Sequence, residues 1–398
     1  MMKVTIVGGG FGGVKTALEL AKNKYTEITL ISDKPDFQYY PALYGTATGH
    51  SKRQAWVALG EIFGNAKNVT VIIDTVLSID PSSKQLKAAS GNTYDYDHCV
   101  LALGAVTTYF GIEGLDTYAH GIKSAEEINR LKHHLYEQMG ERHIIDKNYV
   151  IVGGGPTGVE LAATLGTYLE RLRVYYKLPA HKIHITLVEA SPRVLVRMHE
   201  KTSRNVEKRL KKIGVKVETG KVVQSANADT LMVSGRPIKS QTVIWTSGVA
   251  NNPFFKNNAE HFELSKNGKV VVNEYMQAGK DLYVIGDNAF TQYSGLAQVA
   301  LHDAHFIAHN LEQQRLRKPL KKYKAVMPPV VVPVGENWAV FEWRKLRIKG
   351  WPASLLRRAA DVMGYRDILP LGYALNIWQT QEIVQNDYFT PSAPPAEK

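Results

Sequence analysis

Two glycine-rich stretches decide the fold of this chain: Gly8-Gly9-Gly10-Phe11-Gly12-Gly13 and Gly153-Gly154-Gly155-Pro156-Thr157-Gly158. Each directly follows a short apolar run, over residues 4–7 and 149–152 respectively. The spacing G-x-G-x-x-G between a buried strand and a helix permits a tight turn, close approach of the backbone to a pyrophosphate, and tight packing of the helix on the strand. The phosphate then lies on the amides at the positive end of the helix dipole. The repeat predicts two dinucleotide sites; the alternative is two strand–helix turns that bind nothing.

An acidic residue ends the strand that follows each glycine loop. Asp33 ends the first of these strands and Glu189 ends the second. A carboxylate at this place accepts hydrogen bonds from an adenosine ribose and repels a 2′-phosphate. The second site is therefore predicted to prefer NADH to NADPH. Arg193, four residues after Glu189, is the cation that argues against this preference.

The composition is that of a globular protein with more than one domain. A length of 398 residues predicts about two to three domains. The chain is 44% hydrophobic and 22% charged, and no apolar run reaches the roughly 18 residues that a membrane span requires. A strand begins within the first residues, which leaves no room for a signal peptide. We therefore expect the protein to work on the cytoplasmic side of the membrane.

The single cysteine, Cys99, excludes one class of chemistry. Disulfide reductases and sulfide-oxidising enzymes of the two-dinucleotide architecture need a redox pair of cysteines, and this chain cannot supply one. Cys99 lies in an apolar strand setting over residues 96–101. A buried structural thiol is the better interpretation.

The formal charge of +12 admits a nucleic acid, an anionic membrane surface or an acidic ligand as a partner. No nucleic-acid module and no metal-binding pattern is visible, and the basic surplus is concentrated late in the chain. These observations favour a membrane surface.

The order of expected elements predicts an α/β protein with a coarse internal repeat. Both halves contain an apolar strand that a glycine closes, at Gly104 and at Gly248. The expected elements are a strand, glycine loop and helix over 3–22, a strand over 27–32, strands within 69–101, a polar helix over 123–142, a second βαβ unit over 149–190, a basic helix over 200–212, strands near 215–225, 242–248 and 281–287, and a helix over 296–315.

Together these motifs resemble the flavin-dependent pyridine nucleotide oxidoreductases, and within them the type II NADH dehydrogenases. The resemblance covers roughly residues 1–320, and it is carried by Gly8-x-Gly10-x-x-Gly13, Phe37–Tyr44, Gly153–Glu160, Gly286-Asp287 and Ala297–Ala300. It implies two Rossmann-like domains arranged as in glutathione reductase, with an NADH domain inserted in an FAD domain. The implied boundaries are 1–120 and 250–325 for the FAD domain, 121–249 for the NADH domain, and 326–398 for a C-terminal region that ends in a frayed tail over 391–398.

The resemblance implies non-covalent FAD at the first loop and NADH at the second. Asp287 would bond the ribityl chain, with a helix N-cap as its alternative role. Pro41 would bring the chain past the isoalloxazine, and otherwise simply starts a helix. NADH would be held by Gly153, Gly155, Gly158 and Glu189. The remaining FAD or NADH contacts would be Gly8, Gly10, Phe11, Gly12, Gly13, Asp33, Gly104, Gly248, Gly286, Ala297 and Gln298.

Three residues are candidates for catalytic roles. Glu160 follows the second loop among apolar neighbours, where an acid is costly unless it is paired or used; the resemblance places it near nicotinamide and flavin. Gln298 matches a glutamine near the quinone headgroup. Where the family usually has a second glutamine, this chain has His302, which either relays a proton or is a bonded helix residue.

The C-terminal region predicts an amphipathic helix. Leu355, Leu356, Ala359, Ala360 and Met363 share one face, opposite Arg357, Arg358 and Asp361. Residues 341–366 hold seven Lys and Arg against two acids, a local charge of +5, and an apolar segment over 368–378 carries Tyr373 and Trp378. We expect peripheral anchoring to an anionic membrane. The alternatives are a dimer interface, in the homodimer that we expect, or a cap over the flavin domain.

The predicted function is transfer of a hydride from NADH to FAD and then of two electrons to a membrane quinone, menaquinone or ubiquinone, without proton pumping. One alternative is a soluble NADH-dependent reductase of an iron–sulfur or other small redox protein. The other is a flavoprotein like apoptosis-inducing factor, in which FAD is mainly structural.

Overall fold

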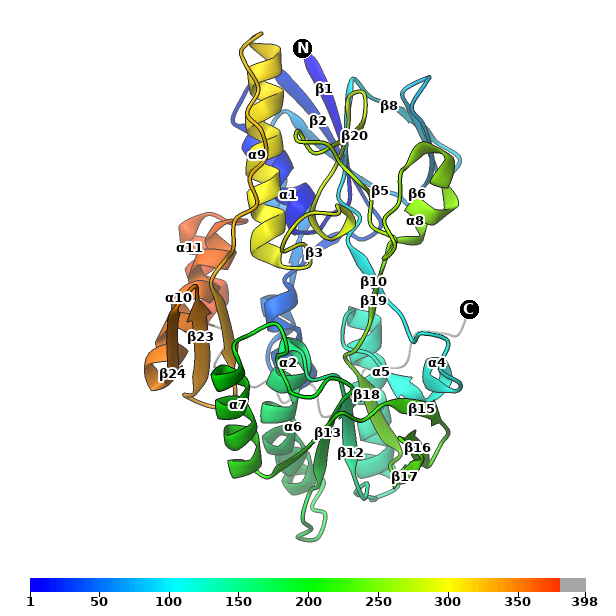
Figure 1. Cartoon of the computed structure of the whole chain (residues 1–398), viewed down its shortest axis with the longest axis vertical. Helices are drawn as coiled ribbons and strands as arrows, with labels where there is room; N and C mark the ends of the chain where they lie inside the picture. The colour runs from blue at the N-terminus through cyan, green and yellow to red at the C-terminus, as the bar shows by residue number, and fades with distance from the viewer. Residues whose placement is uncertain (380–398) are drawn as a thin grey trace.

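The first glycine loop lies between strand β1 (Met2–Val7) and helix α1 (Phe11–Ala21) in the computed structural model, which describes residues 1–379 (Figure 1). The second lies between β12 (Tyr149–Val152) and α6 (Pro156–Tyr175). Both strands are buried along most of their length, as expected for central strands of a parallel sheet with both faces covered. The tail predicted over 391–398 lies outside the described residues.

The first sheet is built from two separate parts of the chain. Its order is β20-β21-β9-β1-β2-β5, and every neighbouring pair is parallel except β20 with β21. Helix α1 packs along α9, so these two helices lie side by side (Figure 1). The remaining elements of this layer are β2 (Thr26–Ser32), β5 (Val69–Ile73), β9 (His98–Leu101), β20 (Gln277–Gly279), β21 (Leu282–Val284) and α9 (Ala297–Arg315).

The second sheet lies wholly within residues 119–245. Its order is β11-β18-β12-β13-β14, with all neighbours parallel. Its strands and flanking helices are β11 (Ala119–His120), β13 (Ile185–Glu189), β14 (Val215–Thr219), β18 (Thr242–Trp245), α5 (Ala125–Tyr136) and α7 (Glu200–Lys212). In Figure 1 the antiparallel pair β10 (Ala105–Thr107) and β19 (Val249–Asn251) runs between this half and the first.

Shorter elements complete the two halves. The helical ones are α2 (Leu43–Ala47), α3 (Leu59–Phe63), α4 (Leu115–Tyr118), α8 (Pro253–Asn257), four 3-10 turns at Tyr40–Ala42, Lys52–Gln54, Ala259–His261 and Gly286–Asn288, and a π turn at Glu137–Glu141. The extended ones are β3 (Asp36–Gln38), β4 (Trp56–Ala58), β6 (Val76–Asp80), β7 (Gln85–Ala88), β8 (Thr93–Asp95), β15 (Val223–Ala226), β16 (Thr230–Val233) and β17 (Arg236–Lys239).

The predicted elements are present, with shifted ends. The polar helix expected over 123–142 is α-helical only over α5 and finishes in the π turn. Its apolar positions Ile128, Leu131 and Leu135 are buried, as the spacing predicted. Cys99 is fully buried in β9, and burial raises the pKa of its thiol, so it is the structural thiol that the sequence indicated.

The C-terminal region forms a three-stranded hairpin sheet followed by two helices, drawn beside the first half in orange and red (Figure 1). These elements are β22 (Val330–Pro333), β23 (Ala339–Trp343), β24 (Leu346–Gly350), α10 (Trp351–Arg366) and α11 (Leu371–Gln379). Among the described residues 1–379, no helix is long and apolar enough to cross a membrane.

Helix α10 packs on the protein through Arg357 and Asp361, two of the three charged residues that the sequence placed on one face, whereas the third, Arg358, is exposed. Asp361 is buried and Arg357 is largely covered, whereas Leu355 and Met363 are 52% and 66% exposed. Helix α10 does cover part of the first half, as the alternative of a cap predicted, because Tyr365 stacks on Tyr39 and donates to the carbonyl of Gln54. The apolar side chains of Leu355 and Met363 are not part of that contact surface.

Candidate functional site

The two glycine loops share one backbone geometry. Gly8 and Gly153 both have φ of +117°, a conformation that favours glycine because other residues carry a Cβ. A Cβ on Gly13 would overlap the carbonyl oxygen of Gly8, and Gly158 stands in the same relation to Gly153. The first and last glycines of each motif are therefore required by the turn and by the packing of helix on strand.

The middle glycine of each motif faces open space. No heavy atom lies within 4 Å of the position that a Cβ on Gly10 or Gly155 would take. In the described part of the chain no side chain caps the first amides of α1 or α6. Both loops thus offer what a dinucleotide pyrophosphate needs, an uncrowded backbone and helix amides.

The other predicted contacts lie at the carboxyl ends of the strands or at the start of α9. This is the edge at which open α/β sheets bind ligands. Phe11 and Gly12 begin α1, Asp33 follows β2 with its side chain exposed, Gly104 follows β9, Gly248 follows β18, Gly286 follows β21, and Ala297 and Gln298 begin α9.

Asp287 lies in the 3-10 turn after β21 and is not the N-cap of α9, which is Leu296. The alternative role of helix cap is therefore wrong. Burial raises the pKa of its carboxyl, and Lys269 and Lys123 oppose that rise. A part-buried acid between two lysines is suited to accept hydrogen bonds from ligand hydroxyls.

Asn288, which the sequence analysis missed, fixes the turn beside Asp287. Its side chain accepts from the amide of Gly104 at 2.8 Å and donates to the Gly104 carbonyl at 2.7 Å. It also donates to Asn251 at 2.6 Å. The signal available in the sequence was an asparagine directly after the Gly286-Asp287 pair, and the structure shows that this residue is fully buried.

At the second loop, the side chain of Glu189 packs against the glycines. Its carboxylate accepts the amide of Gly154 at 2.5 Å and that of Ser191 at 2.6 Å. Each carboxylate oxygen retains acceptor capacity for a ribose hydroxyl. Arg193 is turned into its own loop, where its guanidinium donates to the carbonyls of Leu195, Val196 and Met198 and to Ser203.

The buried acid Glu160, on α6, meets a cation from the C-terminal region. Its Oε1 lies 3.4 Å from Nη1 of Arg357 on α10, and Nε of Arg357 lies 3.0 Å from Asp361. Nη2 of Arg357 donates to the carbonyl of Pro41 at 2.9 Å. One guanidinium therefore joins the second dinucleotide helix to the Pro41 turn. The sequence analysis missed Arg357 as a site residue, although an acid in an apolar helix was a signal that some cation must reach it.

The electrostatics of this cluster favour a protonated acid at neutral pH. Burial raises the pKa of Glu160 to about 8, Arg357 lowers it, and Asp361 raises it. Tyr44 is the other titratable group that faces Glu160, and burial raises the pKa of its phenol. Because Asp361 forms an ion pair with Arg357, Glu160 can hold or release a proton near pH 8 without leaving the guanidinium unpaired.

The remaining candidates lie in the 3-10 turn at Pro41 and on helix α9. Pro41 starts the 3-10 turn Tyr40–Ala42, as its alternative role predicted, and its carbonyl also receives Arg357. Gln298 is exposed on the first turn of α9. His302, one turn later, places Nε2 3.0 Å from the carbonyl of Lys324, so one ring nitrogen fixes the segment after α9. The structure brings Glu160 and Pro41 together through Arg357 and leaves His302 outside that cluster.

Comparison with known proteins shows which family and which solved structures this chain is similar to. A family model described as pyridine nucleotide-disulphide oxidoreductase matches residues 2–304. The type II NADH:quinone oxidoreductase Ndh of Mycobacterium tuberculosis is 28% identical over 78% of this chain and 72% of its own length. The type II NADH:quinone oxidoreductase of Staphylococcus saprophyticus is 25% identical over 93% and 96%. The structure of NDH2 from Plasmodium falciparum with NADH has a TM-score of 0.84 at 16% identity, covering 96% of this chain and 97% of that one.

The raised pKa of Glu160 makes the stability of the fold depend on pH. The folded carboxyl binds its proton more tightly than the unfolded one, so this contribution is present below about pH 4.5 and is lost as the pH rises through about 8. Relative to Glu160→Gln, the unfolding free energy of the wild type should fall by at most about 1.4 kcal/mol per pH unit in that interval. Thermal denaturation from pH 5 to 8 measures it.

The control is Glu170→Gln on the same helix. That carboxyl is exposed and Arg173 lowers its pKa, so the difference from wild type should stay flat over this pH range. A flat difference for Glu160→Gln as well would contradict the assignment of Glu160 as the titrating acid.

Proposed function

This chain belongs to the pyridine nucleotide-disulphide oxidoreductase family, and on that premise we propose that it passes a hydride from NADH to non-covalent FAD and then two electrons to a membrane quinone. The observation that carries the proposal is the pair of equivalent glycine loops, each at the carboxyl edge of its own parallel sheet. The names of its relatives in Mycobacterium and Staphylococcus, both NADH:quinone oxidoreductases, support the acceptor class.

The residues present fit FAD at the first loop. Gly10 and the amides of α1 suit a pyrophosphate, the exposed Asp33 suits the adenosine ribose, and Asp287 suits the ribityl hydroxyls. When bound, FAD supplies the redox chemistry, accepting a hydride and delivering electrons to the quinone. The protein holds and orients the groups between which this happens.

The second loop fits NADH, and its surroundings favour NADH over NADPH. Glu189 presents a carboxylate where a 2′-phosphate would lie, and two backbone amides keep it there. Arg193 is committed to its own loop and so does not offset that charge.

Glu160 and Gln298 are the proposed polar groups nearest the reacting rings. Glu160 holds a proton at neutral pH and Arg357 fixes its position, so it positions the nicotinamide or relays a proton. Gln298 offers an exposed amide at the start of α9 that suits a quinone carbonyl. His302 keeps only Nδ1 for a proton relay, because Nε2 bonds Lys324.

The exposed surface of the C-terminal region suits a peripheral membrane enzyme. Its large exposed apolar side chains are Trp343, Leu346, Trp351, Leu355, Leu356, Met363, Leu371, Tyr373 and Leu375. Six of the seven basic residues in 341–366 are exposed, because only Arg357 is drawn inward. Apolar burial together with attraction of about 1 kcal/mol per basic residue suits an anionic lipid surface. We place it on the cytoplasmic face, where NADH is available.

Steady-state oxidation of NADH by the FAD-loaded protein tests the function. Rates are compared with a short-chain ubiquinone, with a menaquinone analogue and with no acceptor. We expect quinone-dependent turnover well above the oxygen background, because the fold and the relatives favour this acceptor. Rapid reduction of the bound flavin without transfer to either quinone would point to a protein acceptor, and slow reduction would point to a structural FAD.

Selectivity for the nicotinamide cofactor tests the second site. Glu189→Ala should weaken NADH binding several-fold and bring the affinity for NADPH close to that for NADH, since the repelling carboxylate is gone. Titration of both nucleotides against the two proteins measures the ratio. An unchanged ratio would mean that the ribose lies elsewhere.

Vesicle sedimentation tests the membrane surface. Leu355→Ser/Met363→Ser should reduce binding to vesicles rich in anionic lipid several-fold, while reduction of the flavin by NADH stays near wild type. The matched control, Leu77→Ser/Val174→Ser, removes two similarly exposed apolar side chains, one on β6 and one near the C-terminal end of α6, and should bind normally. Equal binding by both variants would contradict the proposal that this face binds lipid. A change from dimer to monomer in place of lost vesicle binding would assign this face to a second copy of the chain.

A further inference from the structure

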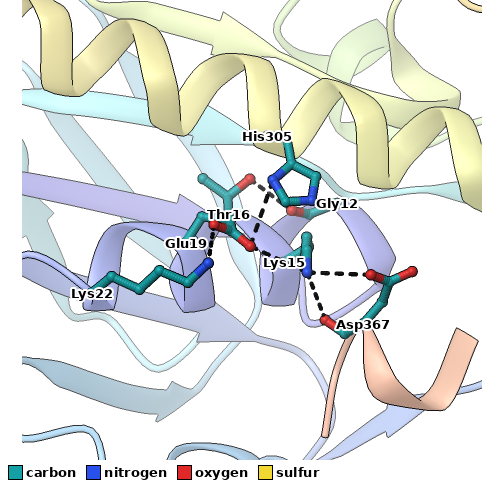
Figure 2. Close-up of polar contacts among 7 residues, drawn as sticks. All are labelled: Gly12, Lys15, Thr16, Glu19, Lys22, His305 and Asp367. Atoms are coloured by element: carbon teal, nitrogen blue, oxygen red, sulfur yellow. Dashed lines mark hydrogen bonds and ion pairs between the residues drawn. The ribbon is translucent and has the colours of Figure 1, made fainter. Parts of the chain in front are cut away.

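A second ionic contact attaches α10 to the protein, at its C-terminal end and on the first dinucleotide helix. Lys15, on α1, is only 7% exposed. Its ammonium donates to the carbonyl oxygen of Asp367 at 2.9 Å and lies 3.5 Å from the carboxylate of the same residue (Figure 2). Asp367 is the C-cap residue of α10. Lys15 therefore places a positive charge at the negative end of that helix.

Further charged residues surround Lys15 and hold its ammonium group in place. Glu19, one turn later on α1, lies 3.2 Å from the Lys15 ammonium and pairs also with Lys22. His305 of α9 approaches Glu19 at 3.5 Å (Figure 2). Although burial opposes it, contacts with Lys22, Lys15 and His305 keep the pKa of Glu19 below its ordinary value. Three helices, α1, α9 and α10, thus meet at one cluster in which positive and negative side chains are paired.

The position of Lys15 on α1 connects this cluster with the first glycine loop. Lys15 follows Gly13 by two residues, and the hydroxyl of Thr16 donates to the carbonyl of Gly12 at 2.7 Å. The amides at the start of the same short helix are the ones that suit the FAD pyrophosphate. A ligand that fixes the start of α1 therefore also fixes the ammonium that caps α10.

We propose that Lys15 is a positioning residue that couples FAD binding at the first glycine loop to docking of the C-terminal region. The inference rests on the proposed function for the site of FAD. Coupling of this kind is reciprocal: if bound FAD stabilises the docked α10, docked α10 must tighten FAD binding by the same factor. The helix that carries the exposed apolar face is then held most firmly in the FAD-loaded protein.

The experiment compares Lys15→Met with Lys22→Met in the full chain. Lys22, the C-cap residue of the same helix, pairs with the same Glu19, but its side chain is 68% exposed and its ion pair joins it to α1 alone. Two quantities are measured for each protein: the dissociation constant for FAD, and hydrogen exchange of the amides of α10 with and without FAD.

In the wild type, FAD should slow exchange in α10. Lys15→Met should weaken FAD binding about tenfold and abolish the FAD-dependent slowing in α10, with exchange in α6 unchanged. Lys22→Met should behave as wild type, and Lys15→Arg should restore part of both effects because it keeps the charge. A folded Lys15→Met protein with wild-type affinity and wild-type slowing would overturn the inference.

If Lys15→Met does not fold, Asp367→Asn provides the second test. It removes the carboxylate charge and keeps the carbonyl, so a smaller loss of FAD affinity and of slowing is expected. No change in either quantity would overturn the coupling. A wild-type chain that binds no FAD would overturn the proposed function as well, whereas normal FAD binding without coupling would overturn this inference alone.

Discussion

The acidic side chain of Glu160, buried in the second dinucleotide helix, needs a polar partner, and Arg357 supplies it from the far end of the chain. Burying a polar or charged group without a partner is costly, so Glu160 and Arg357 together constrain how the C-terminal region can pack. To reach Glu160, Asp361 and the Pro41 carbonyl at once, α10 must turn its charged face inward. Its apolar face is then left outside. The exposed apolar surface of α10 and the arrangement around Glu160 thus follow from the contacts of one guanidinium.

Repetition explains most of the remaining architecture. The same loop, with the same backbone angle at its first glycine, stands at the carboxyl edge of two parallel sheets. The two loops differ in what lies over them: two lysines flank Asp287 on the first side, and Glu189 closes over the glycines on the second. Helix α10 touches the first helix of both units, through Lys15 and through Glu160. One C-terminal helix therefore contacts both dinucleotide-binding halves, which must act together.

The fold could be predicted from the sequence wherever the local spacing of residues dictates structure. Glycine spacing located both loops, the acids at the strand ends pointed to Asp33 and Glu189, and apolar periodicity located α5. It could not say which face of α10 is buried, because a helical period separates two faces without choosing between them. Nor could it show that Arg193 bonds its own loop or that Lys15 caps α10. Those contacts depend on residues brought together only by tertiary packing, as do the hydrogen bonds between Asn288 and Gly104.

If the chain works as proposed, its two dinucleotide sites must act as a pair. Anaerobic titration of the FAD-loaded protein with NADH, followed through the absorbance of the flavin, tests this pairing most directly. The flavin should be fully bleached at about one equivalent of NADH per chain, because each chain holds one site of each kind. If NADH binds with the same stoichiometry while the flavin absorbance stays unchanged, the two sites do not exchange a hydride and the proposed pairing is wrong.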